Sequence, residues 1–276
     1  MAQAAPLPDP EALLHARYRE AAASPAAWND TLATLIGHRS VRAFRADPLP
    51  PGALDLALAA ASSAPTSSNL QTWSVVAVQD RAHKARLGTL AASQTFIDRA
   101  PLLLIWLADL SRLDAMAGRA SKPAGGVHYL EALLVATIDA ALAAQNAVAA
   151  FESLGLGTVY VGAMRNRPEA VAAELGLPKL VFPVFGLSVG HPDPDVATAV
   201  KPRLPPSAVL HHERYTPAAP EGLQAYEGRM GAFQAEQGMA AEPWISRCIS
   251  RMRDAGALSG RDRMRDALAA LGFELK

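Results

Sequence analysis

Apolar residues group into four short runs that have the density of buried strands. Two of them, residues 73–78 and 102–108, are almost continuously apolar, which predicts strands covered on both faces. Residues 157–163 predict a short strand that runs into a tight turn, and residues 182–190 predict another core strand. Since helical patterns separate these runs, the chain is expected to combine helices with a sheet.

Helical periodicity predicts helices over residues 31–36, 51–62, 81–91, 166–176, 223–238 and 244–271, the last breaking at Gly256 or Gly260. The longest helix, 128–154, is rich in alanine and apolar on nearly all sides. Its length approaches the ~20 residues that span a bilayer. Because it also carries Glu131, Asp139, Gln145 and Asn146, we interpret it as a buried core or interface helix. Residues 109–126 predict a flexible loop.

The pattern divides the chain into three parts. Residues 1–28 are rich in Ala and Pro and predict an N-terminal extension with a short helix near 11–22, to which we assign no chemistry. Residues 29–215 hold the regular pattern of a core, and residues 216–276 predict a helical segment that completes the same domain.

Composition narrows the function classes. The chain has 276 residues, of which 50% are hydrophobic, so it can bury a large core. Lys and Arg together number 26, as do Asp and Glu, so no overall charge favours nucleic acid or an anionic membrane. The single cysteine, Cys248, excludes an internal disulfide and fits a reducing interior. The first residues lack a secretion signal, so we expect a cytoplasmic protein without a membrane partner.

Several signatures of other enzyme classes are missing from the sequence. It contains no Gly-x-Gly-x-x-Gly after a strand, no P-loop and no Gly-x-Ser-x-Gly elbow. The pair His211 and His212 lacks the spacing of helical metal ligands, so we expect no metal centre.

A basic stretch after the helix at 31–36 is the first candidate site. His38, Arg39, Ser40 and Arg42 offer cationic and hydroxyl donors suited to phosphate oxygens. The same composition is also common on solvated surfaces. A second cationic pair, Lys201 and Arg203, lies in a segment stiffened by prolines, and is either a double-cation prong or a surface linker.

Polar and glycine-containing turns provide two further candidates. The turn before the first strand carries hydroxyl and amide groups that either bond their own backbone or reach a ligand: Thr66, Ser67, Ser68, Asn69 and Gln71. Gly162 ends the third strand, where glycine permits a turn or the close approach of a flat ligand. The C-terminal arginines alternate with acids, which favours a solvated helix face.

Taken in order, these motifs resemble the FMN-dependent nitroreductase family, in its oxygen-insensitive NADPH nitroreductase and flavin reductase branch. The resemblance extends from about Thr31 to Tyr215 and includes the segments at 143–146, 152–157, 160–166 and 201–205. It implies an α+β fold with a central mixed sheet flanked by helices, in an intertwined homodimer that holds two FMN at its interface.

The resemblance also assigns roles to residues. His38, Arg39, Ser40 and Arg42 would contact FMN, with Arg39 nearer the phosphate and Arg42 nearer the ring. The turn of Thr66, Ser67, Ser68, Asn69 and Gln71 would contact the flavin and ribityl chain, partly from the second subunit. Gln94 would touch the flavin; Tyr160, Val161, Gly162 and Ala163 would run along the ring; and Lys201 and Arg203 would close on the pyrimidine edge and phosphate.

The implied activity is two-electron hydride transfer by a ping-pong route, from NADPH or NADH through FMN to nitroaromatics, quinones or free flavin. A flavin-binding carrier or sensor without turnover is the alternative. Two departures from the family pattern bear on it. Ala163 replaces a glycine and adds a methyl group, and the loop at 238–244 contains Glu242 but no cation to hold the NADPH 2′-phosphate.

Overall fold

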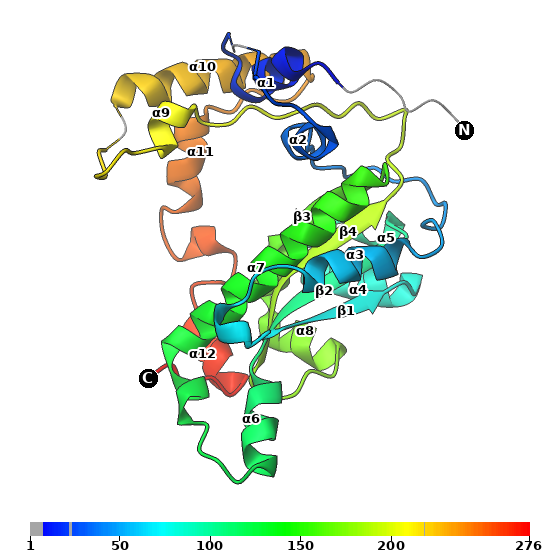
Figure 1. The fold of residues 1–276 in the computed structure, drawn as a ribbon, viewed down its shortest axis with the longest axis vertical. Helices are drawn as coiled ribbons and strands as arrows, with labels where there is room; N and C mark the ends of the chain where they lie inside the picture. Colours follow the sequence, from blue (N-terminus) through cyan, green and yellow to red (C-terminus); the bar gives the residue numbers. More distant parts are fainter. Residues whose placement is uncertain (1–7, 22–23, 218) are drawn as a thin grey trace. The chain divides into compact units, whose positions relative to one another are not determined.

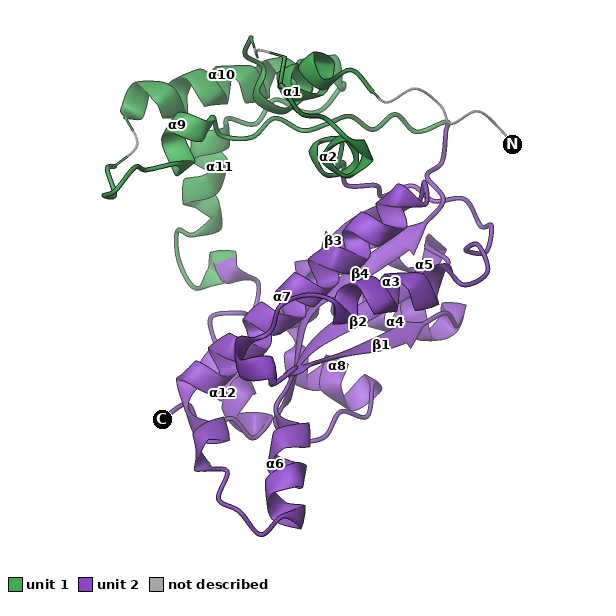
Figure 2. Ribbon diagram, in the orientation of Figure 1, with its two compact units in different colours: residues 1–39, 195–257 green, residues 40–194, 258–276 purple. Residues whose placement is uncertain are grey.

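The computed structural model describes residues 8–21, 24–217 and 219–276. They form two compact units, coloured separately in Figure 2. Unit 1 comprises residues 1–39 and 195–257, and unit 2 comprises residues 40–194 and 258–276. The predicted helix near 11–22 is observed as α1 (Pro10–Tyr18), and its predicted end at Ala22 lies outside the described residues.

Unit 2 is built on a four-stranded sheet in the order β1-β2-β4-β3 (Figure 1). The strands are β1 (Trp73–Val78), β2 (Leu102–Asp109), β3 (Gly157–Val161) and β4 (Val181–Gly190). All three pairings are antiparallel. Parallel pairing enters through a bridge between Ser40 and Thr158, which extends the sheet beyond β3.

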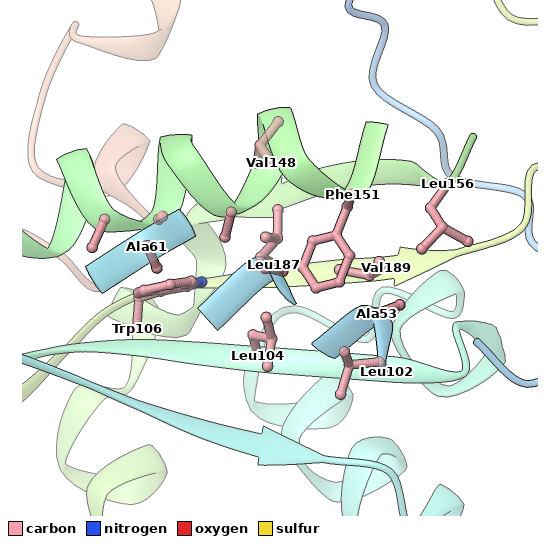
Figure 3. Close-up of a cluster of buried hydrophobic side chains, with 14 of the residues drawn as sticks. Ala53, Ala61, Leu102, Leu104, Trp106, Val148, Phe151, Leu156, Leu187 and Val189 are labelled. Atoms are coloured by element: carbon pink, nitrogen blue, oxygen red, sulfur yellow. The ribbon is translucent and has the colours of Figure 1, made fainter. Parts of the chain in front are cut away.

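Alternation along β2 explains why helices cover both faces of the sheet. Leu102, Leu104 and Trp106 pack in one cluster with residues of α3 (Ala53–Ser62) and α7 (Leu130–Ser153), as Figure 3 shows. The intervening side chains pack in a second cluster with residues of α4 (Arg81–Leu90), α5 (Phe96–Arg99) and α8 (Pro168–Glu174). β2, one of the two inner strands of the sheet, is therefore buried along its full length.

The prediction for the first strand was right in extent and wrong in burial. β1 lies at the edge of the sheet, and most of its residues are only partly buried. An apolar run does not distinguish a central strand from an edge strand that is only partly buried.

The long helix α7 is the one described helix that is apolar and long enough to cross a membrane. Its small residues Ala136, Ala140, Ala143 and Ala147 are at most 1% exposed. They belong to the core clusters that lie against the sheet. The interpretation of this segment as a core helix therefore agrees with its packing.

The prediction of a flexible loop at residues 109–126 was wrong. Residues Ser111–Arg119 form α6, and a 3-10 helix, η2 (Gly125–His128), precedes α7. α12 (Met264–Ala270) completes unit 2, and Leu268 and Phe273 pack with α7 residues in one cluster. The predicted break in the C-terminal helix occurs from Met252 onward, with a 3-10 turn, η4 (Gly256–Leu258), between α11 and α12.

The regular elements described in unit 1 are helices. Besides α1 the unit contains α2 (Asp30–Ile36), α9 (Pro206–Val209), α10 (Pro220–Glu236) and α11 (Trp244–Arg251). Its small core gathers Tyr226, Met230 and Phe233 from α10, with Leu204 and Trp244 packed against them. The proposed three-part division of the chain stays a prediction.

Candidate functional site

The part of the basic stretch that belongs to unit 2, residues 40–42, pairs with β3. The Val41 amide donates to the Thr158 carbonyl at 2.9 Å. Glycine is needed opposite it, because a Cβ at Gly157 would lie 2.7 Å from the Val41 side chain. Val41 is buried while its neighbours Ser40 and Arg42 are exposed, so the strand-like alternation presents both polar side chains to solvent beside β3.

The turn before β1 has an unusual backbone. Ser68, Asn69 and Gln71 have φ values of 48°, 54° and 52°, in the left-handed region that non-glycine residues seldom occupy. Ser67–Asn69 form a 3-10 turn, η1, and Thr66 Oγ1 accepts a hydrogen bond from the Gln71 amide at 2.9 Å. Strain of this kind is concentrated at binding sites, where the surrounding structure holds it in place.

Two side chains hold this turn against the rest of unit 2. Asp139 of α7 is 2% exposed and accepts bonds from the Thr72 amide at 3.0 Å and the Thr72 hydroxyl at 2.9 Å. Arg112 of α6 donates to the carbonyls of Gln71 and Trp73, both at 2.6 Å. The turn is therefore fixed at its C-terminal end, while the side chains of Ser67, Ser68 and Asn69 remain exposed.

The end of β3 presents an aromatic ring. Tyr160 is 37% exposed and meets Phe185 edge-on, with ring centroids 5.1 Å apart. Its hydroxyl lies 3.4 Å from Gln145 Oε1 of α7. Burial, reinforced by the nearby Glu152 carboxylate, raises the pKa of the Tyr160 phenol, so this group stays protonated across the physiological range.

The chain then turns through η3 (Gly162–Asn166). Ala163 is 6% exposed and belongs to a core cluster with Met164 and Val171. It is not among the residues with positive φ. Alanine therefore fits this backbone, and its methyl group packs in the core.

Within unit 1 the two cationic segments lie together. Arg39 Nε donates to Thr198 Oγ1 at 2.9 Å, across 159 positions of sequence. Arg17 of α1 donates to the His38 carbonyl at 2.8 Å and to the Lys201 carbonyl at 2.8 Å. The side chains of Arg39 and Arg203 are exposed, so the positive charges of both segments are available to an anion.

Each unit has a cavity beside these residues. The cavity in unit 1 has a volume of about 770 Å³, and its wall combines Lys201 and Arg203 with Tyr226 and Trp244. The cavity in unit 2 has a volume of about 590 Å³, and its wall includes Asn69, Gln71, Ser74 and Arg112. One cavity thus offers cations beside aromatic rings, and the other offers amides and a hydroxyl beside apolar side chains.

The predicted residues are thereby placed in three groups. His38, Arg39, Lys201 and Arg203 are brought together in unit 1. In unit 2, Ser40 and Arg42 lie beside β3, which leads to Tyr160, Val161, Gly162 and Ala163. Tyr160 of this strand is hydrogen-bonded to α7. The turn at 66–71 is also linked to α7, through Thr72, which follows it. Gln94 is half-buried just after Ala92 and Ser93, which have positive φ, and among the described ranges no hydrogen bond joins its side chain to the other groups.

Sequence reasoning missed the supporting residues Arg17, Arg112 and Asp139. Asp139 left a signal, because a carboxylate in an apolar alanine-rich helix requires a buried partner. Arg17 and Arg112 left none, since they fall in segments interpreted as an extension and a loop.

Sequence models of known families match most of the chain. The model of the nitroreductase family matches residues 35–191, and that of the C-terminal domain of the nitroreductase family matches residues 201–276. Among curated proteins, the FMN reductase [NAD(P)H] of Bacillus subtilis is 39% identical over 208 residues, which are 74% of this chain and 83% of that protein. The oxygen-insensitive NADPH nitroreductase of Salmonella typhimurium is 37% identical over 75% of this chain and 84% of its own length.

Solved structures agree with this assignment. NfrA2 of B. megaterium superposes with a TM-score of 0.84 at 35% identity, covering 90% of this chain and all of its own. The NADPH:FMN oxidoreductase of Vibrio harveyi, solved in complex with NAD+, gives a TM-score of 0.80 at 29% identity over 90% of this chain and 100% of that chain. These matches confirm the predicted α+β fold and the predicted branch: the chain belongs to the nitroreductase family.

Proposed function

We propose that this chain is an FMN-dependent NAD(P)H oxidoreductase that reduces small acceptors such as nitroaromatics, quinones or free flavin. Its relatives are named FMN reductases and nitroreductases, which supports the predicted activity. The observation that carries the proposal is the joining of the segments of Arg39 and of Lys201 and Arg203 in unit 1, because it brings cationic residues suited to a phosphate into one part of the unit.

The donor set of the chain fits FMN, which joins an anionic phosphate to an apolar ring with a polar edge. Exposed guanidinium groups suit the phosphate, and the left-handed turn at 66–71 presents hydroxyl and amide groups suited to the ribityl chain and ring edge. When bound, FMN supplies the two-electron chemistry between NAD(P)H and the acceptor.

The protein's own residues would bind and orient FMN. Arg39 and Arg203 would hold the phosphate, and Lys201 and Arg42 would place positive charge toward the ring. The backbone from Tyr160 to Ala163 would contact the ring, with an N–H near Gly162 and Ala163 available to it. No side chain is needed as a nucleophile or as a general base, since the reacting atoms belong to FMN and the substrates.

The choice of nicotinamide donor depends on unit 1. The loop before α11 has no cation, and its Glu242 pairs with Arg247 of α11, with 3.2 Å between nitrogen and oxygen. Because Glu242 offsets the nearby positive charge, we expect NADH to be accepted as well as NADPH.

A homodimer is supported by an apolar stripe on α7. Leu130, Leu134, Ile138 and Leu142 recur every four residues and are between 40% and 56% exposed. A monomer would leave this stripe in water, so we infer that a second copy of the chain covers it. Ile138→Asp is expected to convert the dimer to monomers in size-exclusion chromatography with light scattering, while a dimer of unchanged mass would contradict this assignment.

The reaction is tested by an anaerobic half-reaction. FMN-loaded protein is mixed with NADPH or NADH, and the visible flavin absorbance is followed before and after a quinone is added. Bleaching by the nicotinamide and recovery with the quinone are expected. Protein that binds FMN and never bleaches would instead be a carrier or sensor. We place the enzyme in the cytoplasm, where the exposed thiol of Cys248 remains reduced.

A further inference from the structure

The helix α1 precedes the part of the chain that the family model matches, which begins at residue 35. It nevertheless contacts both cationic segments of unit 1 through one side chain. One terminal nitrogen of Arg17 donates to the Lys201 carbonyl at 2.8 Å, and the other donates to the carbonyls of Ile36 at 2.7 Å and His38 at 2.8 Å. A single guanidinium group thus bridges segments more than 160 residues apart in sequence.

The acceptors explain why an arginine occupies this position. Ile36 is the last residue of α2, and its carbonyl has no partner within the helix. A cation at a helix C-terminus is also favoured by the helix dipole. The planar fork of arginine points two nitrogens in different directions, which suits acceptors that come from two segments.

The backbone of Arg17 adds a fourth link. Its carbonyl accepts a hydrogen bond from the Arg203 amide at 2.9 Å. Arg17 therefore holds the backbone of Lys201 and Arg203 on one side and that of His38 on the other.

The helix is itself anchored by residues that do not touch the cationic segments. Arg19, at its C-cap, forms a double hydrogen bond to Glu236 of α10, at 2.7 and 2.8 Å. Arg229 of α10 donates to the Tyr18 carbonyl at 3.1 Å. The bonds that anchor α1 to α10 are thus distinct from the bonds by which Arg17 joins the two cationic segments. A substitution can therefore remove one set and leave the other.

We propose that Arg17 is a positioning residue for the anionic end of the cofactor: it holds the His38–Arg39 and Lys201–Arg203 segments at a fixed spacing so that Arg39 and Arg203 converge on one phosphate. The proposal rests on the proposed function in that the phosphate belongs to FMN. Segments held in advance need not be ordered during binding, so pre-organisation favours affinity. Like charges held close together repel one another, and a bound dianion relieves this repulsion.

The test uses Arg17→Met, which keeps the methylene stem and removes the guanidinium, in the full-length protein. Glu236→Ala is the matched control, because it removes the anchoring pair of the same helix and leaves the Arg17 bonds in place. FMN dissociation constants and the amide hydrogen exchange of residues 36–39 and 201–203 in FMN-free protein are measured for both variants.

Arg17→Met is expected to weaken FMN binding by about 10-fold or more, because side chains and loop segments that are no longer held in advance must be ordered on binding. Riboflavin affinity is expected to change much less. Exchange in both segments should rise without FMN present, whereas Glu236→Ala should change FMN affinity less than about 3-fold. Arg17→Lys should fall between the wild type and Arg17→Met, since one nitrogen replaces two.

Unchanged FMN affinity and exchange in Arg17→Met would overturn the proposal, as would equal losses in Arg17→Met and Glu236→Ala. If Arg17→Met lowers only the melting temperature, its role is structural and the proposal fails. If wild-type protein binds no FMN, the proposed function fails; the exchange measurement then still shows whether Arg17 holds the two segments together.

Discussion

The buried carboxylate of Asp139 offers a sharp test of how the turn at 66–71 is held. Asp139→Ala removes two charge-assisted hydrogen bonds to Thr72, at 3.0 and 2.9 Å, from a position that is 2% exposed. At about 1.5–3 kcal/mol each, their loss lowers the free energy of unfolding by about 3–6 kcal/mol. Since Thr72 follows the turn directly, the turn should also become more mobile.

Urea unfolding and FMN titration measure these two effects. Glu131→Ala is the control, because it removes the same charge from an exposed position of the same helix and should cost less than about 1 kcal/mol. Asp139→Asn, which keeps one acceptor oxygen, should have an intermediate effect. If Asp139→Ala and Glu131→Ala were equally stable, the buried bonds of Asp139 would not support the turn.

Two further predictions concern residues proposed to contact the cofactor. Arg203→Ala should weaken FMN binding about 10- to 150-fold, the equivalent of about 1.5–3 kcal/mol. Arg253→Ala is the control and should leave FMN binding unchanged, because the Arg253 side chain pairs with Asp254 at 2.8 Å. Equal FMN affinities of the two variants would show that Arg203 does not bind FMN. The raised pKa of Tyr160 keeps its phenol neutral in the folded protein, so the associated stability is full below the ordinary tyrosine pKa of about 10 and is lost as pH rises above it. Tyr160→Phe should therefore flatten the fall in melting temperature above about pH 10, while Tyr215→Phe, at a position 77% exposed, should leave that fall unchanged.

The strands and the long helix could be predicted because their patterns are local. β1 and β3 were bounded correctly or nearly so, and the alternation along β2 determines which side chains face α7. The edge position of β1 could not be predicted, because it depends on which strand pairs with which. α6 was missed because its apolar face is short and lies among charged and small residues: Leu113 packs against the core only partly buried, and none of the helix residues is buried.

The candidate site was also predictable only where its signal is local. The cationic segments and the polar turn could be recognised from their residue types, and the resemblance to a family assigned them to one binding site. The residues that support them were not visible, since Arg17 and Arg112 act on backbone carbonyls of distant segments. Such bonds depend on tertiary geometry and leave no pattern in the sequence.

We propose that this chain holds FMN by its phosphate. The most direct measurement is a parallel titration of the FMN-free protein with FMN and with riboflavin, which differs by lacking that phosphate. Two or more charge-assisted bonds at about 1.5–3 kcal/mol each predict that FMN binds about 100-fold or more tightly than riboflavin. Equal affinities for the two flavins, or no binding of either, would show that this chain does not hold FMN by its phosphate.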